Sequence, residues 1–173
     1  MSVMDDESAL VQRARAGDRE AFSDLAVLHW RRLLALARSI VADLEAEDVV
    51  QDGLIKAWKK IGSLREPAAF SAWLTRIVAN TAVARARRRK IFRPINGADF
   101  AADVVSPDHR IDLECLLAKL APRQRAVLHL TVVEGLSDTE IAEVLGIASS
   151  SVRVHRLRGR RHLERLAARG GER

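Results

Sequence analysis

The stretch that decides the fold runs from Leu136 to Leu163 and reads LSDTEIAEVLGIASSSVRVHRLRGRRHL. Ser137, followed three residues later by Glu140, forms the capping box that begins a helix, because each of these residues satisfies a free backbone amide of the first turn. Gly146 stands where the chain must take a left-handed conformation to leave that helix. The apolar face between these two signals consists of Ile141, Ala142, Val144 and Leu145.

A second helix is predicted to start at the serines that follow. Val152 and Leu163 can face inward, whereas arginines lie at three- and four-residue spacings on another face. Two short helices, a glycine turn and a basic second helix predict a helix-turn-helix, whose second helix enters the DNA major groove. The DNA contacts expected from it are Ser149, Ser150, Ser151, Arg153, Arg156 and Arg160.

An ordinary helical hairpin with a solvated arginine face is the alternative, because most runs of charge are solvated. That alternative explains the arginines but not the other signals. The capping box, the turn glycine and the small residue Ala142, which lets two helices approach closely, coincide with the basic helix. This coincidence favours DNA binding over the hairpin.

Composition favours a helical protein with a polyanionic partner. The chain has 173 residues, which suits one domain or two small ones, and 4% aromatic residues with no Tyr. Helical packing by Ala, Leu and Val is therefore expected rather than a β-sandwich. The net charge is +6 and the pI is about 10.4. Residues 85–93 and 149–173 each carry +6, so two basic blocks stand on an acidic body.

The periodicity of apolar residues predicts an all-α fold of two small helical domains joined by a flexible linker. The first domain is expected to span residues 1–90 and to hold four helices. The first helix is expected to be capped by Asp5 or Asp6 and to end near Ala16. The second and third are expected over about 18–41 and 45–60. After a loop at 61–66, the fourth starts at Pro67 and continues into the arginine run.

Residues 91–107 lose helical periodicity and contain Pro, Gly and Ser, which is typical of an interdomain linker. The second domain is expected to span residues 108–173. It adds a helix that ends near Ala121 and a helix over about 122–135, and it ends with the helix-turn-helix.

An acidic cluster lies around the start of the predicted helix at 45–60. Its members are Asp43, Glu45, Glu47, Asp48 and Asp52. The helix dipole favours acids in a first turn, which is one explanation. Five acids are more than a cap requires, so a basic protein partner is the other explanation. Charge alone leaves both open.

Three segments of the chain resemble conserved regions of bacterial RNA polymerase sigma factors. Residues 47–58, EDVVQDGLIKAW, and residues 70–82, FSAWLTRIVANTA, with the arginine run that follows, are similar to the second conserved region. Residues 120–127, LAPRQRAV, together with the helix-turn-helix, resemble the fourth region. The resemblance covers nearly all of residues 8–167 in the expected order, with no other domain, as in the extracytoplasmic-function (ECF) group.

The resemblance implies a subunit that binds core RNA polymerase, directs it to promoters and assists promoter melting. The helix bearing Asp48, Gln51 and Asp52 would dock on a coiled coil of the polymerase's largest subunits. The acidic cluster would then be a protein interface. The second domain would read the minus-thirty-five element as duplex DNA, and an anti-sigma factor clamped against both domains would restrain the protein.

The same resemblance implies that the first domain captures the non-template strand of the minus-ten element. The loop that begins at Ser63 and the helix holding Arg76 and Asn80 would provide the contacts. Melted DNA needs a pocket for an extruded base and cations along the backbone. Arg87 and Arg88, in the basic run, would supply such cations.

The recognition helix departs from the common pattern of these relatives. After the valine that pattern has a basic residue, any residue and then Arg-Leu, followed later by Arg-Gly-Arg-Arg. Residues 158–161 fit the pattern, whereas His155, Arg156 and Leu157 shift the Arg-Leu pair by one position. The shift changes which side chain faces the core.

Trp58 and Trp73 could be taken for platforms on which bases stack. Both recur in helical phase with apolar neighbours such as Leu54 and Ile77. This phase favours a place in the core for the two rings.

The sequence gives no support for an enzyme, a cofactor or a metal site. The histidines are scattered without a metalloprotease motif, and Cys115 is alone, so neither a disulfide nor a cysteine zinc site is expected. No signal peptide or membrane-length apolar run is present, which predicts a cytoplasmic protein without membrane insertion. A stand-alone helix-turn-helix regulator and an adaptor that binds acidic partners other than DNA are the alternative functions.

Overall fold

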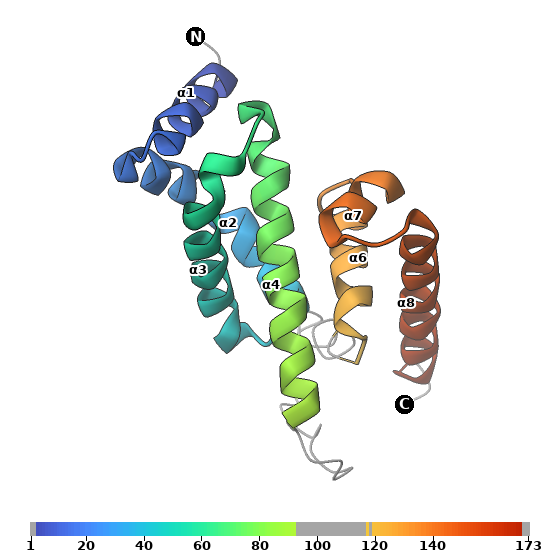
Figure 1. Cartoon of the computed structure of the whole chain (residues 1–173). Helices are drawn as coiled ribbons and strands as arrows, with labels where there is room; N and C mark the ends of the chain where they lie inside the picture. The colour runs from blue at the N-terminus through green and yellow to red at the C-terminus, as the bar shows by residue number, and fades with distance from the viewer. Residues whose placement is uncertain (1–2, 93–116, 118, 171–173) are drawn as a thin grey trace.

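The computed structural model describes residues 3–92, 117 and 119–170, and every regular element in these ranges is helical (Figure 1). The first group of helices comprises α1 (Val3–Arg15), α2 (Arg19–Ile40), α3 (Asp43–Lys60) and α4 (Phe70–Phe92), with short 3-10 turns η1 (Ile61–Ser63) and η2 (Pro67–Ala69) before α4. The second group comprises α6 (Pro122–Val132), α7 (Asp138–Leu145) and α8 (Ser149–Gly170). The predicted all-α fold with two helical regions is confirmed.

The predicted linker and the helix before Ala121 fall mostly outside the described residues. The exception is the start of the linker, because α4 continues to Phe92, two residues into the predicted range 91–107. The arginine run is therefore helical through Phe92. His109 and Cys115 also lie outside the described residues.

Local capping explains where α1 ends and α2 begins. Gly17 has a φ of +98°, which is the left-handed conformation that a turn after a helix needs. Asp18 then caps α2 as predicted, since its Oδ1 accepts hydrogen bonds from the amides of Glu20 and Ala21 at 3.0 and 3.1 Å. The expected cap of α1 is wrong. That helix already begins at Val3, so the two acids at positions 5 and 6 lie inside it, where the helix dipole also favours them.

The core of the first group lies between α2, α3 and α4. Its largest fully buried side chains are Leu25, Leu33, Leu36, Ile40, Val49, Val50, Phe70, Leu74 and Val78. Trp58 packs against this core with its ring 5.2 Å from that of Phe22, and Trp73 lies 5.9 Å from the ring of Phe70. Both rings are half-buried and pack against the core as predicted, and Trp73 also lines a surface hollow beside α4.

A glycine sets the distance between α3 and α4. A Cβ atom on Gly53 would lie only 2.7 Å from Cγ2 of Val78, so a larger residue fits only if the Val78 side chain or the two helices shift. This close approach places the acidic side of α3 next to the basic end of α4.

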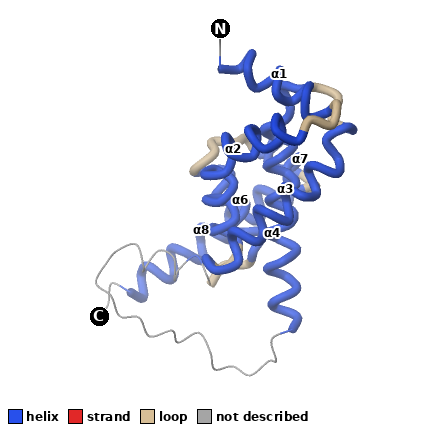
Figure 2. Tube along the Cα trace, turned by 90° about the vertical axis from the view of Figure 1, so that its left-hand side faces the viewer, coloured by secondary structure: helices blue, strands red, loops and turns tan. Residues whose placement is uncertain are grey.

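The second group of helices packs on the first (Figures 1 and 2). Helix α6 packs against α2 and α4, and α7 packs against α4. Helix α8 packs mainly against α6 and α7 of its own group. Val127, Leu130, Ile141 and Leu145 are buried and belong to the same apolar cluster as the core of the first group. The described residues therefore form one continuous core.

Candidate functional site

The turn between α7 and α8 has the geometry that its sequence predicts. The Ser137 amide donates to Glu140 Oε2 at 2.8 Å, and the Glu140 amide donates to Ser137 Oγ at 3.4 Å, which completes the capping box. The Ser137 hydroxyl, with help from its amide, lowers the pKa of the Glu140 carboxyl below its ordinary value. Gly146 ends α7 with a φ of +62°. The predicted start and end of α7 are confirmed.

Helix α8 packs one narrow face against α6 and α7. Val152 is fully buried, and Gly159 approaches α6 so closely that a Cβ there would lie 3.0 Å from Cδ1 of Leu128. Small residues at this contact let the two helices meet. The opposite face of α8 is left open to solvent.

The predicted DNA contacts of α8 lie at different depths. Ser150, Arg153 and Arg160 are exposed, whereas Ser149 and Ser151 are half-buried at the start of the helix. The exposed members therefore point away from the other helices, where a duplex can reach them.

Arg156 is held by a partner inside the protein. Its guanidinium makes a bidentate ion pair with the carboxylate of Asp138, with Nη1 on Oδ1 and Nη2 on Oδ2, the second at 3.1 Å. Asp138 is the first residue of α7, so this pair fastens the two helices of the motif together. Arg156 thus lies on the side of α8 that faces α7.

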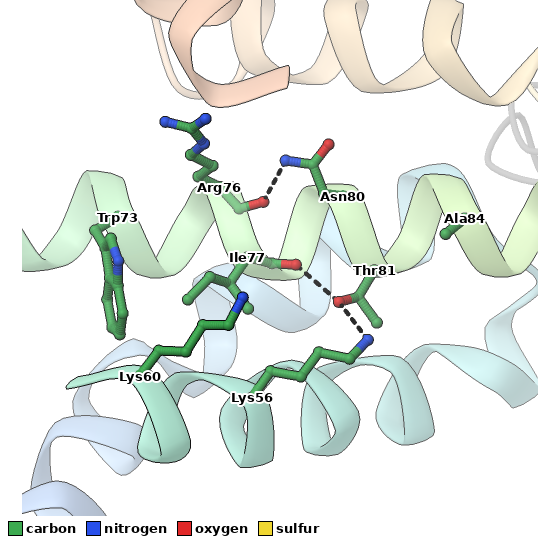
Figure 3. A pocket seen from close by; sticks show the side chains of 8 residues that line it. All are labelled: Lys56, Lys60, Trp73, Arg76, Ile77, Asn80, Thr81 and Ala84. Atoms are coloured by element: carbon green, nitrogen blue, oxygen red, sulfur yellow. Dashed lines mark hydrogen bonds between the residues drawn. The ribbon is translucent and has the colours of Figure 1, made fainter. Parts of the chain in front are cut away.

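A basic hollow of about 420 Å³ lies beside α4 (Figure 3). Its lining comes from α3 and α4 and consists of Lys56, Lys60, Trp73, Arg76, Ile77, Asn80, Thr81 and Ala84. Lys56 Nζ donates to Thr81 Oγ1 at 3.1 Å, and that hydroxyl donates to the Ile77 carbonyl at 2.8 Å. The structure therefore brings Arg76 and Asn80 together with two lysines that were not predicted, whereas the other predicted minus-ten residues, Ser63, Arg87 and Arg88, do not line this hollow.

Asn80 faces α7 rather than open solvent alone. Its Nδ2 donates to the Arg76 carbonyl on its own helix and to the Val144 carbonyl of α7, each at 2.9 Å. Ser63, in η1, is exposed and donates its hydroxyl to the Lys60 carbonyl at 2.7 Å. The amide of Asn80 is thus occupied by the second group of helices.

The acidic side of α3 faces the basic end of α4. Arg85 reaches Asp52 at 3.4 Å and Asp48 at 3.5 Å, and Arg89 reaches Glu45 at 3.5 Å. These are long, solvent-exposed pairs, which contribute little to stability. Asp48 and its neighbour Gln51 remain exposed and able to meet a partner. Arg87 and Arg88 are exposed on α4 as well.

Comparison with known proteins identifies the family of this chain. The chain matches the Sigma-70 region 2 family over residues 25–91 and the Sigma-70, region 4 family over residues 110–163. It is 36% identical over 155 residues to the ECF RNA polymerase sigma factor SigM of Mycobacterium tuberculosis, covering 87% of this chain and 79% of SigM. The chain belongs to the ECF sigma factors. It is also 32% identical to the RNA polymerase sigma-H factor of Pseudomonas aeruginosa, with 95% of each chain covered.

Two solved structures share the fold of this ECF sigma factor. CnrH in complex with the cytosolic domain of CnrY matches with a TM-score of 0.68 at 29% identity, covering 94% of this chain and 97% of CnrH. The sigma factor RpoE of Bartonella quintana, in complex with the anti-sigma factor NepR, matches with a TM-score of 0.66 at 29% identity, covering 85% and 96%. The family does not act by catalysis. Its members direct RNA polymerase to promoters in transcription initiation, and so does this protein.

Polar contacts tie the two regions of this sigma factor together. Arg32 of α2 donates from Nη1 to Glu134 Oε2 at 3.0 Å and from Nη2 to the hydroxyls of Ser71 and Thr75, each at 2.9 Å. His129 of α6 lies 3.9 Å from the same carboxylate. No local spacing predicts this cluster, because Arg32, Ser71 and Glu134 are far apart along the chain.

The surroundings of two histidines in the second region lower their pKa values. Burial lowers the pKa of His129, against the opposing effect of Glu134. Burial also lowers the pKa of His155, and Arg123, Arg158 and Arg87 lower it further. Cations from α4, α6 and α8 therefore act on one another across the two regions.

Within the described ranges, no group of three or more histidine, cysteine or acidic side chains is arranged to hold a metal ion. Among the helices in those ranges, none is both long and apolar enough to cross a lipid bilayer.

Proposed function

We propose that this sigma factor uses three separate surfaces in initiation. The acidic side of α3 binds core polymerase, the basic hollow of α4 receives the non-template strand of the minus-ten element, and the outer face of α8 reads the minus-thirty-five duplex. These roles correspond to domains at residues 1–90 and 108–173, with a linker at 91–107. Core enzyme and promoter DNA are the partners, and both place the protein in the cytoplasm.

The distribution of charge supports this proposal most directly. Asp48 and Gln51 are exposed on α3, Arg87 and Arg88 on α4, and Arg153 on α8. The surface of α3 that faces a protein partner is thus acidic, while the surfaces of α4 and α8 that face DNA carry arginines. Phosphate contacts from such arginines give affinity, and base contacts from the recognition helix give sequence preference.

Capture of the minus-ten strand requires α7 to leave α4. The amide of Asn80, an expected base contact, is bonded to the Val144 carbonyl while the two regions are packed together. A polymerase that binds the separated form more tightly shifts the equilibrium toward it. In this proposal the described arrangement is the resting form, and core enzyme opens it.

An anti-sigma factor is part of the proposal. The related CnrH and RpoE structures contain the cytosolic domain of CnrY and the anti-sigma factor NepR, respectively. In this chain a partner that touches both regions would hold α7 on α4 and keep the Asn80 amide bonded to the Val144 carbonyl. Such a partner is expected to slow hydrogen exchange of the α7 amides and to suppress run-off transcription together.

Charge reversal tests the polymerase surface. Asp48→Arg combined with Asp52→Arg is expected to abolish retention of core enzyme in a pull-down and to abolish run-off transcription, since both side chains are on the surface and their loss leaves the core intact. Glu20→Arg combined with Asp24→Arg, two exposed acids on α2, is the matched control and should retain core enzyme. Retention of core enzyme by the α3 variant at the wild-type level would contradict the docking role.

Promoter selection tests the DNA surface. Run-off transcription with purified core enzyme, on a library with randomised minus-thirty-five segments, is expected to give a defined preference with the wild-type chain. Arg153→Ala should change or weaken that preference while core binding stays the same. An unchanged preference would contradict reading of the duplex by α8.

A further inference from the structure

The outer face of α8 carries two large apolar side chains among arginines. Val154 is 43% exposed and Leu157 is 50% exposed. At 100° per residue, these two lie on the side of the helix opposite the buried Val152 and Gly159. Ser150 and Arg161, both exposed, continue the same outward stripe.

The ion pair of Arg156 fixes this orientation. Because Arg156 points to Asp138 on α7, the next side chain, Leu157, is turned outward. The outward position of Leu157 therefore follows from the ion pair and the helical period together.

The charges around the apolar pair indicate what covers it. Arg153, Arg158 and Arg161 surround it and are exposed, and none of the three makes an ion pair with another described residue. An apolar protein surface placed here would bury these cations without partners, which costs free energy. A duplex offers phosphates to the arginines and, on the floor of the major groove, an apolar group to the aliphatic side chains.

That apolar group is the C5 methyl of thymine, the one such group that a base pair shows in the major groove. We propose that Leu157, together with Val154, reads thymine methyl groups on neighbouring base pairs of the minus-thirty-five element. The inference rests on the proposed reading of that element by α8. The rise between the two residues is about 4.5 Å along the helix, close to the step of about 3.4 Å between stacked bases.

Uracil in place of thymine tests the inference, because it removes the methyl group and leaves the base-pairing edges unchanged. The probe is the duplex selected from a randomised minus-thirty-five library by holoenzyme built from the full chain. The selected sequence should contain thymine at one or two adjacent positions. Uracil at such a position should weaken wild-type binding about fourfold, the value expected for one apolar carbon group.

Leu157→Ala should bind the thymine and uracil duplexes equally at one of these positions, which assigns the discrimination lost there to this side chain. Arg153→Ala should instead weaken binding to both duplexes by the same factor. Val27→Ala, which shortens an apolar side chain on α2 that is 74% exposed, should keep the fourfold difference. Thermal unfolding of each variant should match the wild type, because all three side chains are on the surface.

Equal binding of the two duplexes by the wild-type chain would overturn the inference. A fourfold difference that persists in Leu157→Ala at every thymine position, or a selected sequence without thymine, would overturn it as well. These outcomes leave the proposed function intact as long as the wild type still selects a minus-thirty-five sequence. Absence of any selection would overturn the reading role of α8 and the inference with it.

Discussion

Arg32 of α2 and Glu134, which follows α6, are 102 residues apart in the chain and meet in an ion pair of 3.0 Å. The Glu134 side chain is only 12% exposed, so the pair is shielded from solvent on one side. The second guanidinium nitrogen of Arg32 is bound by Ser71 and Thr75 at the start of α4. One arginine thus joins α2, α4 and the end of α6, and with them the two groups of helices.

Breaking this pair is expected to loosen the packing of the two regions. In Glu134→Gln, Arg32 keeps its hydroxyl partners and can still donate to the neutral amide oxygen, but it loses the ion pair, at a cost of about 1.5 kcal/mol to the closed arrangement. Hydrogen exchange of the α7 amides, measured with the free chain, should speed up by roughly tenfold or more for that change in free energy.

Arg38→Ala supplies the matched control for that measurement. Arg38 pairs with Asp43 at 2.7 Å, but both side chains are at least half exposed and lie within the first region. Exposed pairs contribute little, so exchange in α7 should stay at the wild-type rate. The same rate in Glu134→Gln would show that the ion pair does not hold the regions together.

The packed arrangement is expected to weaken on mild acidification. Burial lowers the pKa of His129 in the folded protein below its ordinary value of 6.5, and the unfolded chain therefore binds a proton more readily. The contribution of the neutral histidine is fully present above pH 6.5 and is lost as the pH falls from 6.5 through the lowered pKa. The melting temperature should decrease over that interval in the wild type.

His129→Gln should reduce the dependence of the melting temperature on pH between pH 6.5 and about 5. His155, whose pKa is also lowered, will leave a residual slope that His155→Gln removes. The carboxyls of Asp18 and Glu140 also have lowered pKa values. Their contribution to the stability of the fold is lost only below about pH 4.5, outside this interval. A slope that survives in the double histidine variant would exclude this explanation.

Signals between near neighbours could be read from the sequence. The capping box of Ser137 and Glu140, the left-handed Gly146 and the Asp18 cap each depend on residues at most three positions apart, and the structure has all of them. The helix phase of Trp58 likewise placed its ring in the core.

Contacts between distant residues could not be read in this way. The bond from Asn80 to the Val144 carbonyl joins positions 64 residues apart, and no local spacing reports it. Arg156 was expected on the DNA side because its spacing from Arg153 and Arg160 suits one helix face. Its turn toward Asp138 depends on the crossing of α7 and α8, which is set by packing rather than by helical period.

The close contact between α3 and α4 predicts a cost for a single methyl group. Gly53→Ala places a Cβ 2.7 Å from Val78 Cγ2. Overpacking costs about 1–3 kcal/mol, and the better helix propensity of alanine offsets about 1 kcal/mol of this. Denaturant unfolding should therefore show a small net loss, which Val78→Ala in the same chain should reduce. Gly62→Ala has open space around it and should change little. Equal stability of the two single variants would remove the proposed limit on the helix spacing.

The last prediction concerns the pair that sets the rotation of α8. Asp138→Asn and Arg156→Met each remove the bidentate contact, and each is expected to destabilise the chain by about 1.5–3 kcal/mol, because the remaining partner is half-buried. The double variant should cost less than the two single changes added together, with a coupling of about 0.5–3 kcal/mol in a double-mutant cycle. Binding to the selected minus-thirty-five duplex should weaken in Asp138→Asn although Asp138 lies on α7, because α8 can then rotate and carry Leu157 away from its outward position. Additive costs, together with unchanged duplex binding, would mean that packing of Val152 and Gly159 alone orients the recognition helix.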